Sequence, residues 1–210
     1  MATNDLHQPV GLTLWQRFVK RAFDIITSAL GLLLTWWIII PAFVAASIDT
    51  RKWGFFTQER VGRHGKLFKV IKLRTMREIG GLQTTVTTAE DLRTTPLGRF
   101  FRRTKIDELP QLINVLLGQL SFVGPRPDVP GFADELGGDD RIILSVRPGI
   151  TGPATLRFRN EEEILAVQEY AEKYNREVIY PEKVRLNREY VENYSFWRDM
   201  RYIWRTLTGG

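Results

Sequence analysis

Two adjacent carboxylates, Asp107 and Glu108, are the residues of this sequence best suited to chemistry. Apolar residues follow them at the spacing of one helical face, which predicts a helix that begins near Asp107 and ends at Gly118. If Asp107 is the N-cap, Pro110 removes a backbone donor that a capping carboxylate would take, so that Asp107 could point outward. A helix N-terminus keeps a carboxylate ionised and also attracts phosphate. The pair therefore suits phosphoryl chemistry, although solvated capping residues would look the same.

Cations surround this pair in the sequence. The turn Gly124-Pro125-Arg126-Pro127 is stiffened by two prolines around one guanidinium, which is a good way to present a bidentate phosphate donor, although a plain rigid loop would have the same sequence. A second turn, RPGITG, presents Arg147, for which a structural role is at least as good an explanation. Four further cations immediately precede the acidic pair: Arg99, Arg102, Arg103 and Lys105.

Several long motifs occur in a fixed order. The run TTPLGRFFRRTKIDELPQLINVLLGQLSFVGPRP is preceded by KRAFD and by FFTQERVGRHGKLFKVIKLRTM, and it is followed by RPGITG. Together they resemble the bacterial sugar transferase family, the monotopic phosphoglycosyl transferases or polyprenyl-phosphate hexose-1-phosphate transferases. The resemblance extends from about Lys20 to the C-terminus.

The resemblance implies transfer of a sugar-1-phosphate from a UDP-sugar to a polyprenyl phosphate such as undecaprenyl phosphate, the first membrane step of surface glycan or exopolysaccharide assembly. Asp107 would attack the phosphate next to the sugar, UMP would leave, and a covalent phosphosugar intermediate would pass its group to the lipid. A Mg²⁺ ion is expected beside the diphosphate, contacted by Asp107 and Glu108. The residues expected to bind substrate phosphates are Lys72, Arg102, Arg126 and Arg147.

Composition limits the partners. The 210 residues carry a net charge of +6, which indicates an anionic partner such as nucleotide phosphates, a lipid surface or nucleic acid. The absence of cysteine excludes disulfides and Cys-ligated zinc, and two isolated histidines do not indicate a histidine metal site.

An uncharged run from Ile25 to Ile48 is 24 residues long, enough for a helix to cross a bilayer. Length alone favours a simple transmembrane span, but cations flank both ends of the run, and cations mark a cytoplasmic side. Pro41 would cause a kink. The resemblance implies a re-entrant helix, although this chain has Thr35-Trp36-Trp37 where the family usually has a Ser-Pro pair. We therefore predict a flexible tail (1–11), a re-entrant membrane helix (12–50) and a catalytic domain (51–210) on the cytoplasmic face of the bacterial inner membrane.

The remaining elements are expected to be short. Segments 55–59 and 67–73 predict a β-hairpin that places Lys72, Arg74, Gln58 and Arg60 on one face, with Arg60 and Arg74 as weaker site candidates. Helices are expected at 96–103, 139–146 and 161–178, and a loop at 79–92. The last helix, 196–207, interleaves aromatic residues with arginines, as at a bilayer interface. The predicted class is α+β, mostly helical, with a small β-hairpin, the re-entrant helix and C-terminal interfacial amphipathic helices.

Two other functions fit part of this pattern. A non-catalytic membrane-bound adaptor could bind anionic lipid or a nucleotide through the same basic residues, and a nucleic-acid-binding protein would also be basic. Neither explains an acidic pair among arginines, so we expect an enzyme with no nucleic-acid partner. The sequence indicates neither the sugar nor the oligomeric state.

Overall fold

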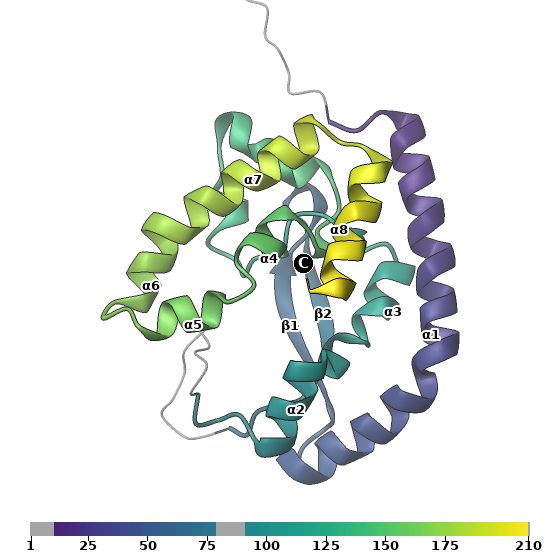
Figure 1. Cartoon of the computed structure of the whole chain (residues 1–210), viewed down its shortest axis with the longest axis vertical. Coiled ribbons are helices and arrows are strands. Elements are labelled where there is room, and N and C mark those ends of the chain that lie inside the picture. The colour runs from purple at the N-terminus through teal and green to yellow at the C-terminus, as the bar shows by residue number, and fades with distance from the viewer. Residues whose placement is uncertain (1–10, 79–90, 210) are drawn as a thin grey trace, which may run out of the picture.

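A computed structural model describes residues 11–78 and 91–209 of the chain (Figure 1). The predicted tail lies outside the described residues except for Gly11, and so does most of the predicted loop 79–92. A β-hairpin occupies the centre, and the helices are arranged around it. The helices are α1 (Leu14–Thr50), α2 (Pro96–Thr104), α3 (Gln111–Leu116), α4 (Pro153–Arg157), α5 (Glu161–Ala166), α6 (Ala171–Tyr174), α7 (Tyr180–Glu192) and α8 (Phe196–Thr208). The strands are β1 (Phe55–Val61), β2 (Leu67–Leu73), β3 (Ser121–Val123) and β4 (Gly149–Thr151).

The predicted hairpin is confirmed. Strands β1 and β2 pair antiparallel, with Phe56 opposite Lys72 and Arg60 opposite Phe68. Because paired residues of an antiparallel sheet point to the same side and side chains alternate along a strand, Gln58, Arg60 and Lys72 share one face. The hairpin thus places a lysine and an arginine from two strands on the same surface.

Helix α1 begins with a capping box in which Thr13 and Gln16 bond each other's backbone N–H groups. It stays a single helix through Pro41, and Figure 1 shows that its C-terminal part bends towards α2. The helix is long and apolar enough to cross a membrane by length and composition, and only 17% of its most apolar window is buried. The core helix of a soluble protein would be mostly buried. The apolar side of α1 is instead exposed, as in a helix that contacts lipid.

One face of α1 carries a buried polar stripe. Lys20, Asp24 and Ser28, four residues apart, are almost completely buried. Lys20 forms a 2.5 Å ion pair with Asp199 of α8. Asp24 accepts hydrogen bonds from the Ser121 hydroxyl and the next backbone N–H, at the start of β3. These contacts hold the apolar helix against β3 and α8. Three polar residues spaced four apart in an otherwise apolar helix are the pattern by which the sequence could have indicated this buried polar face.

Two apolar cores hold the elements together. The larger lies around α7, β3 and a 3₁₀ helix at Gly138–Ser145, which was predicted as a helix at 139–146. The smaller joins α1, β2 and α2 through Ala46, Leu73 and Phe101. The α+β class and the predicted helices at 96–103 and 196–207 are confirmed.

Two features differ from expectation. The predicted helix at 161–178 is broken into α5, α6 and a π-helical turn at Asn175–Ile179 that leads into α7, because charged periodicity alone does not fix where a helix ends. A short parallel pair of strands, which no local pattern indicated, brings the two motifs together: β3 directly precedes GPRP, and β4 lies within RPGITG.

Candidate active site

The acidic pair lies in a tight turn between two helices. Helix α2 ends at Thr104, the next residue, Lys105, reverses the chain with a φ of 59°, and a 3₁₀ helix, Ile106–Glu108, follows directly. The prediction that Asp107 is the N-cap is wrong: Pro110 holds that position in α3 and provides no side-chain cap. Asp107 is only 7% exposed, so it also does not point outward. The helix does end at Gly118 as expected, with a φ of 80°.

One buried amide fixes α3 against the hairpin. Asn114, with none of its surface exposed, accepts from the backbone N–H of Ile71 at 3.0 Å and donates to the Lys69 carbonyl at 2.8 Å. Its amide also donates to Gln119. Because these bonds join α3 to the strand that carries Lys72, Asn114 sets how the acidic turn lies relative to that lysine.

Arg147 lies at the opposite end of α3. Its Nε donates to the Gly118 carbonyl at 2.8 Å, and Arg21 donates to the carbonyls of Val115 and Leu116 at 2.6 and 2.8 Å. These carbonyls at the C-terminal end of a helix need partners, and cations there are favourable. Within the described residues, no contact joins Arg147 to Asp107 or Glu108. The structure therefore does not bring Arg147 together with the other predicted site residues.

Glu108 is the centre of a charged cluster. Lys72 Nζ donates to its Oε1 at 3.3 Å, and Arg126 Nη2 lies 3.6 Å from the same oxygen. Burial alone would raise the pKa of Glu108, but the charges of Lys72, Arg126 and Lys105 lower it to about 2. Burial also lowers the pKa of Lys72 despite this carboxylate. Glu108 is therefore ionised at neutral pH, and its charge offsets part of the positive charge of the predicted phosphate-binding residues Lys72 and Arg126.

Asp107 has a different environment. Its Oδ1 is buried and has no hydrogen-bond partner among the described residues. Burial, followed by the charge of Glu108, raises the pKa of Asp107, and the opposing effects of Lys72, Lys105 and Arg102 are smaller. A helix end is expected to lower the pKa of Asp107, but burial beside another carboxylate is the stronger effect and shifts this pKa upward. An uncompensated buried oxygen costs folding energy and is often found where a ligand completes the site.

Two arginines flank the pair. Arg102 Nε donates to the Thr75 hydroxyl at 3.1 Å, and its Nη1 lies 3.7 Å from Glu162. Arg60 donates to the Pro127 carbonyl at 3.1 Å and to Gln58 at 2.6 Å, and it has no carboxylate partner within the described residues. Burial, then repulsion from Arg126, lowers the pKa of Arg60 to about 10. The hairpin face predicted Arg60 only weakly, whereas the structure makes it a strong candidate to bind an anion. The other weak candidate, Arg74, instead donates to the Trp53 carbonyl.

The acidic pair offers a partial metal site. Carboxylate oxygens are the ligands that Mg²⁺ prefers, and the unpartnered Oδ1 of Asp107 is such an oxygen. No group of three or more acidic, histidine or cysteine side chains in the described segments could hold a metal by itself. Mg²⁺ commonly uses one or two carboxylates together with substrate phosphates. The residues present therefore fit an ion that binds with its substrate.

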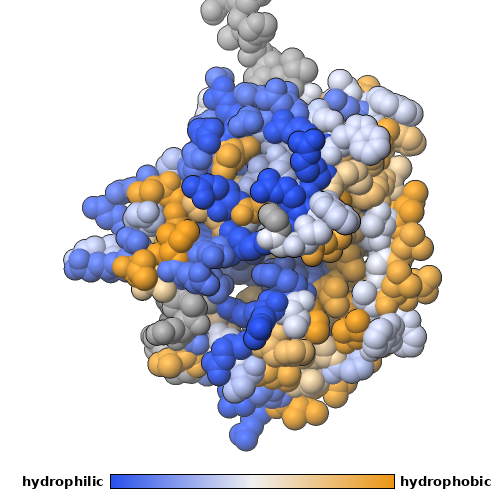
Figure 2. Space-filling model, in the orientation of Figure 1, coloured by the Kyte–Doolittle hydropathy of each residue, from blue (hydrophilic) through white to orange (hydrophobic). Residues whose placement is uncertain are grey.

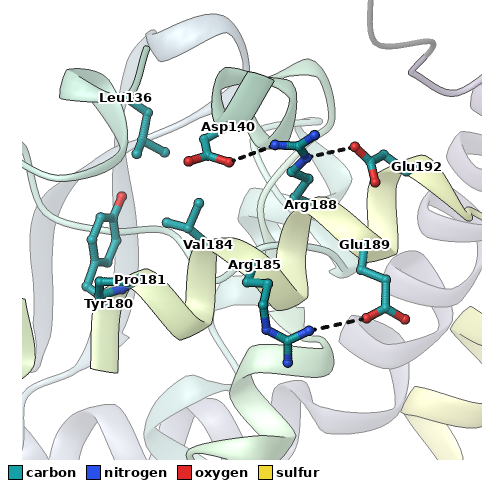
Figure 3. Close-up of a pocket in the computed structure, with 9 residues that line it drawn as sticks. All are labelled: Leu136, Asp140, Tyr180, Pro181, Val184, Arg185, Arg188, Glu189 and Glu192. Atoms are coloured by element: carbon teal, nitrogen blue, oxygen red, sulfur yellow. Dashed lines mark hydrogen bonds and ion pairs between the residues drawn. The ribbon is translucent and has the colours of Figure 1, made fainter. Parts of the chain in front are cut away.

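The surface around the hairpin is concave. Figure 2 shows a hollow in the middle of this face, rimmed by hydrophilic side chains, whereas the side formed by α1 is largely hydrophobic. A second cavity of about 440 Å³ lies over α7 and the 3₁₀ helix 138–145 (Figure 3). Its charged side chains pair with one another, as Arg188 does with Asp140 and Glu192, and no predicted site residue lines it. The cluster on the hairpin is therefore the better site for phosphate chemistry.

Comparison with known proteins places this geometry in context. The chain is 33% identical over 207 residues to the undecaprenyl-phosphate galactose phosphotransferase of Salmonella typhimurium, and 34% identical over 199 residues to the UDP-glucose:undecaprenyl-phosphate glucose-1-phosphate transferase of Escherichia coli. These alignments cover 90% and 92% of the chain, and the chain spans about two fifths (40%) of the length of each relative. A putative undecaprenyl-phosphate N-acetylgalactosaminyl 1-phosphate transferase of Bacillus subtilis is 39% identical over 137 residues, covering 60% of the chain and 76% of the relative.

A family profile also matches the chain. The profile described as bacterial sugar transferase matches residues 15–209, which is nearly the whole chain and includes the acidic turn, the hairpin and the GPRP turn. This match agrees with the resemblance seen in the sequence motifs. The chain belongs to the bacterial sugar transferase family.

Proposed function

We propose that the chain transfers a sugar-1-phosphate from a UDP-sugar to undecaprenyl phosphate or a similar polyprenyl phosphate, with release of UMP. The observation that carries this proposal is the unpartnered, buried carboxylate oxygen of Asp107 beside a cluster of cations held together by Glu108. The names of the relatives, which refer to undecaprenyl phosphate and to glucose, galactose or N-acetylgalactosamine, support the reaction class but do not agree on one sugar.

The reaction has two displacements. An oxygen of Asp107 attacks the phosphorus next to the sugar, and the bond from that phosphorus to UMP breaks, which leaves an aspartyl phosphosugar. A phosphate oxygen of the polyprenyl phosphate then attacks the same phosphorus and releases the Asp107 carboxylate. The lipid leaves as a polyprenyl diphosphate sugar. A carboxylate suits both steps. It attacks in the first step without the help of a general base, and it is a good leaving group in the second.

Positive side chains make this attack possible. Arg60, Lys72, Arg102 and Arg126 would neutralise the diphosphate, so that one anion can approach another. Glu108 would keep Lys72 and Arg126 directed at this place. Asp107 and Glu108 would hold Mg²⁺, whose chemistry when bound is to screen charge on the diphosphate oxygens.

The test of the nucleophile is the mass of the trapped enzyme. Protein incubated with donor and Mg²⁺ but no lipid acceptor should gain one phosphosugar on Asp107, located by mass spectrometry of its peptides. Asp107→Asn should fold, gain no mass and release no UMP. Asp139→Asn is the matched control, because Asp139 lies on the surface and its one ion pair among the described residues is with Arg188. Full turnover by Asp107→Asn would refute the assignment, and no UMP from the unchanged protein with any UDP-sugar would favour a non-catalytic adaptor.

We also propose that α1 enters the bacterial inner membrane from the cytoplasmic side and returns to it. Cations flank both of its ends, Pro41 lies within it, and Figure 1 shows its bend. Helix α8 would lie at the same surface, since Trp197 and Trp204 are exposed beside its arginines. A re-entrant helix keeps both ends, and so the acidic turn, at one membrane surface with both substrates.

The absence of cysteine makes this topology testable. Single cysteines placed at Thr13 and at Gln58, one in each variant, should both be protected from a membrane-impermeant maleimide added to intact spheroplasts and labelled after lysis. Labelling of either position in intact spheroplasts would show that α1 spans the membrane.

A further inference from the structure

Asp128 is a half-buried carboxylate next to the proposed phosphate site that the reaction above does not use. It directly follows the GPRP turn, and its backbone is fixed: its carbonyl accepts from the Val61 N–H at 2.9 Å, and the carbonyl before it accepts from Arg60 at 3.1 Å. The end of β1 therefore determines where this side chain lies. A residue held at both its own carbonyl and the preceding one cannot easily move away from Arg60.

Among the residues that the structure describes, the carboxylate of Asp128 has charged neighbours but no hydrogen-bond or ion-pair partner. Its charge interacts with Lys183, Arg60, Arg126 and Glu161, yet within residues 11–78 and 91–209 it forms no hydrogen bond or ion pair. Each neighbouring cation binds another group. Lys183 Nζ donates to both oxygens of Glu161 at 2.6 and 2.7 Å. Arg60 donates to Gln58 and the Pro127 carbonyl, and Arg126 points to Glu108.

This arrangement favours one kind of ligand group. An ionised carboxylate only accepts hydrogen bonds, so it repels phosphate and binds hydroxyl groups. Burial raises the pKa of Asp128 to about 6 although Lys183 and Arg60 oppose the shift, so the group is mostly ionised at neutral pH. Next to the cations that would hold a diphosphate, the groups of a sugar nucleotide that carry hydroxyls are its ribose and its hexose.

We propose that Asp128 is a specificity-determining residue that accepts a hydrogen bond from a hydroxyl of the sugar-nucleotide donor whose diphosphate lies against Arg60 and Arg126. This inference rests on the proposed function. It adds a recognition contact to it, because cations can bind any nucleoside diphosphate, whereas a fixed acceptor distinguishes donors by their hydroxyls.

The experiment compares donors that differ by one hydroxyl. The best donor among UDP-glucose, UDP-galactose and UDP-N-acetylgalactosamine is compared with its 2′-deoxyuridine analogue and with its monodeoxy hexose analogues. For each, kcat/KM of phosphosugar-adduct formation is measured for the unchanged protein, Asp128→Asn, Asp128→Ser and the surface control Asp139→Asn. Thermal unfolding of every variant shows that it is folded.

Removal of the contacted hydroxyl should lower kcat/KM of the unchanged protein roughly 10- to 100-fold, the usual effect of a hydrogen bond to a charged group. Asp128→Ser, which keeps no carboxylate, should lose most of that preference while the effects of the other hydroxyls persist, and Asp128→Asn should show a smaller loss. The ribose and hexose analogues show which sugar Asp128 contacts. Asp139→Asn should keep the full preference.

Two results would overturn the inference. One is an equal loss of activity towards every donor in the Asp128 variants, which a purely structural role predicts. The other is a preference among the analogues that the Asp128 substitutions leave unchanged. Failure of the proposed function looks different, because the unchanged protein would then form no adduct with any of the three parent donors.

Discussion

Replacement of Glu108 by glutamine removes the carboxylate that pairs with both Lys72 and Arg126. The carboxylate is 3.3 Å from Lys72 and 3.6 Å from Arg126, and its side chain is 16% exposed, so solvent screens it only partly. Glutamine has nearly the same shape but no charge. The substitution therefore tests the electrostatics of the cluster with little change in packing.

The pKa of Glu108 gives the size of the effect. A carboxyl group whose pKa falls from 4.5 to about 2 on folding stabilises the folded state by about 3 kcal/mol at neutral pH. The stabilisation is complete above the unfolded-state value near 4.5 and is lost as the pH falls towards 2. Burial lowers the pKa of Lys72 and Glu108 opposes that shift, so the substitution also removes a favourable charge interaction from the lysine. We expect Glu108→Gln to cost about 1–3 kcal/mol at pH 7.

Thermal unfolding in detergent micelles measures this loss. For a chain of this length, 1 kcal/mol shifts Tm by about 2–4 °C, so the variant should melt about 2–12 °C below the unchanged protein at pH 7. The difference should shrink as the pH is lowered from 5 towards 3, because only the unchanged protein loses this stabilisation there. Glu162→Gln is the matched control, since Glu162 is 55% exposed and lies 3.7 Å from Arg102. Its Tm should change little. Equal Tm values for Glu108→Gln and the unchanged protein at pH 7, or a difference that persists unchanged to low pH, would refute the reasoning.

Three further predictions follow from the site. Asn114→Ala should destabilise the protein by about 2–4 kcal/mol, because it leaves a buried N–H and a buried carbonyl of β2 unpaired; chemical denaturation measures this, and a cost below about 0.5 kcal/mol would contradict it. The rate of adduct formation should fall as the pH is lowered, and this fall should begin above the pH at which an ordinary aspartate is protonated, because burial raises the pKa of Asp107 and only its ionised form attacks. A pH–rate profile that is flat down to about 4 would be inconsistent with this. Arg126→Gln should raise KM for the donor roughly 10-fold or more, whereas Arg147→Gln should mainly lower Tm, since Arg147 binds the Gly118 carbonyl. A raised KM for Arg147→Gln together with an unchanged KM for Arg126→Gln would instead indicate that Arg147 binds a substrate phosphate.

Local patterns in the sequence predicted much of the fold. Strand alternation on either side of a glycine-containing turn predicted the hairpin, and it placed Lys72 and Arg60 on one face, because side-chain direction follows from backbone geometry alone. A long uncharged run predicted α1 because its length reflects the thickness of a bilayer. The motifs around Asp107 and Glu108 identified the family, and the family profile confirms it.

Tertiary structure decided how these residues act. Glu108 and Lys72 are 36 positions apart, and they meet because Asn114 bonds α3 to β2. Nothing in the local sequence gives that distance. The same packing directs Arg147 to the end of α3 and away from the acidic pair.

The two adjacent acids show the division most clearly. By sequence, Asp107 and Glu108 are adjacent carboxylates near the start of a predicted helix, and nothing in it separates their pKa values. In the structure, burial raises the pKa of Asp107, whereas Lys72 and Arg126 overcome burial and lower that of Glu108 to about 2. Residue types and their order thus determined the family and the candidate nucleophile. Ionisation and contacts were decided by the fold, because they depend on the burial and charge contributed by segments distant in the chain.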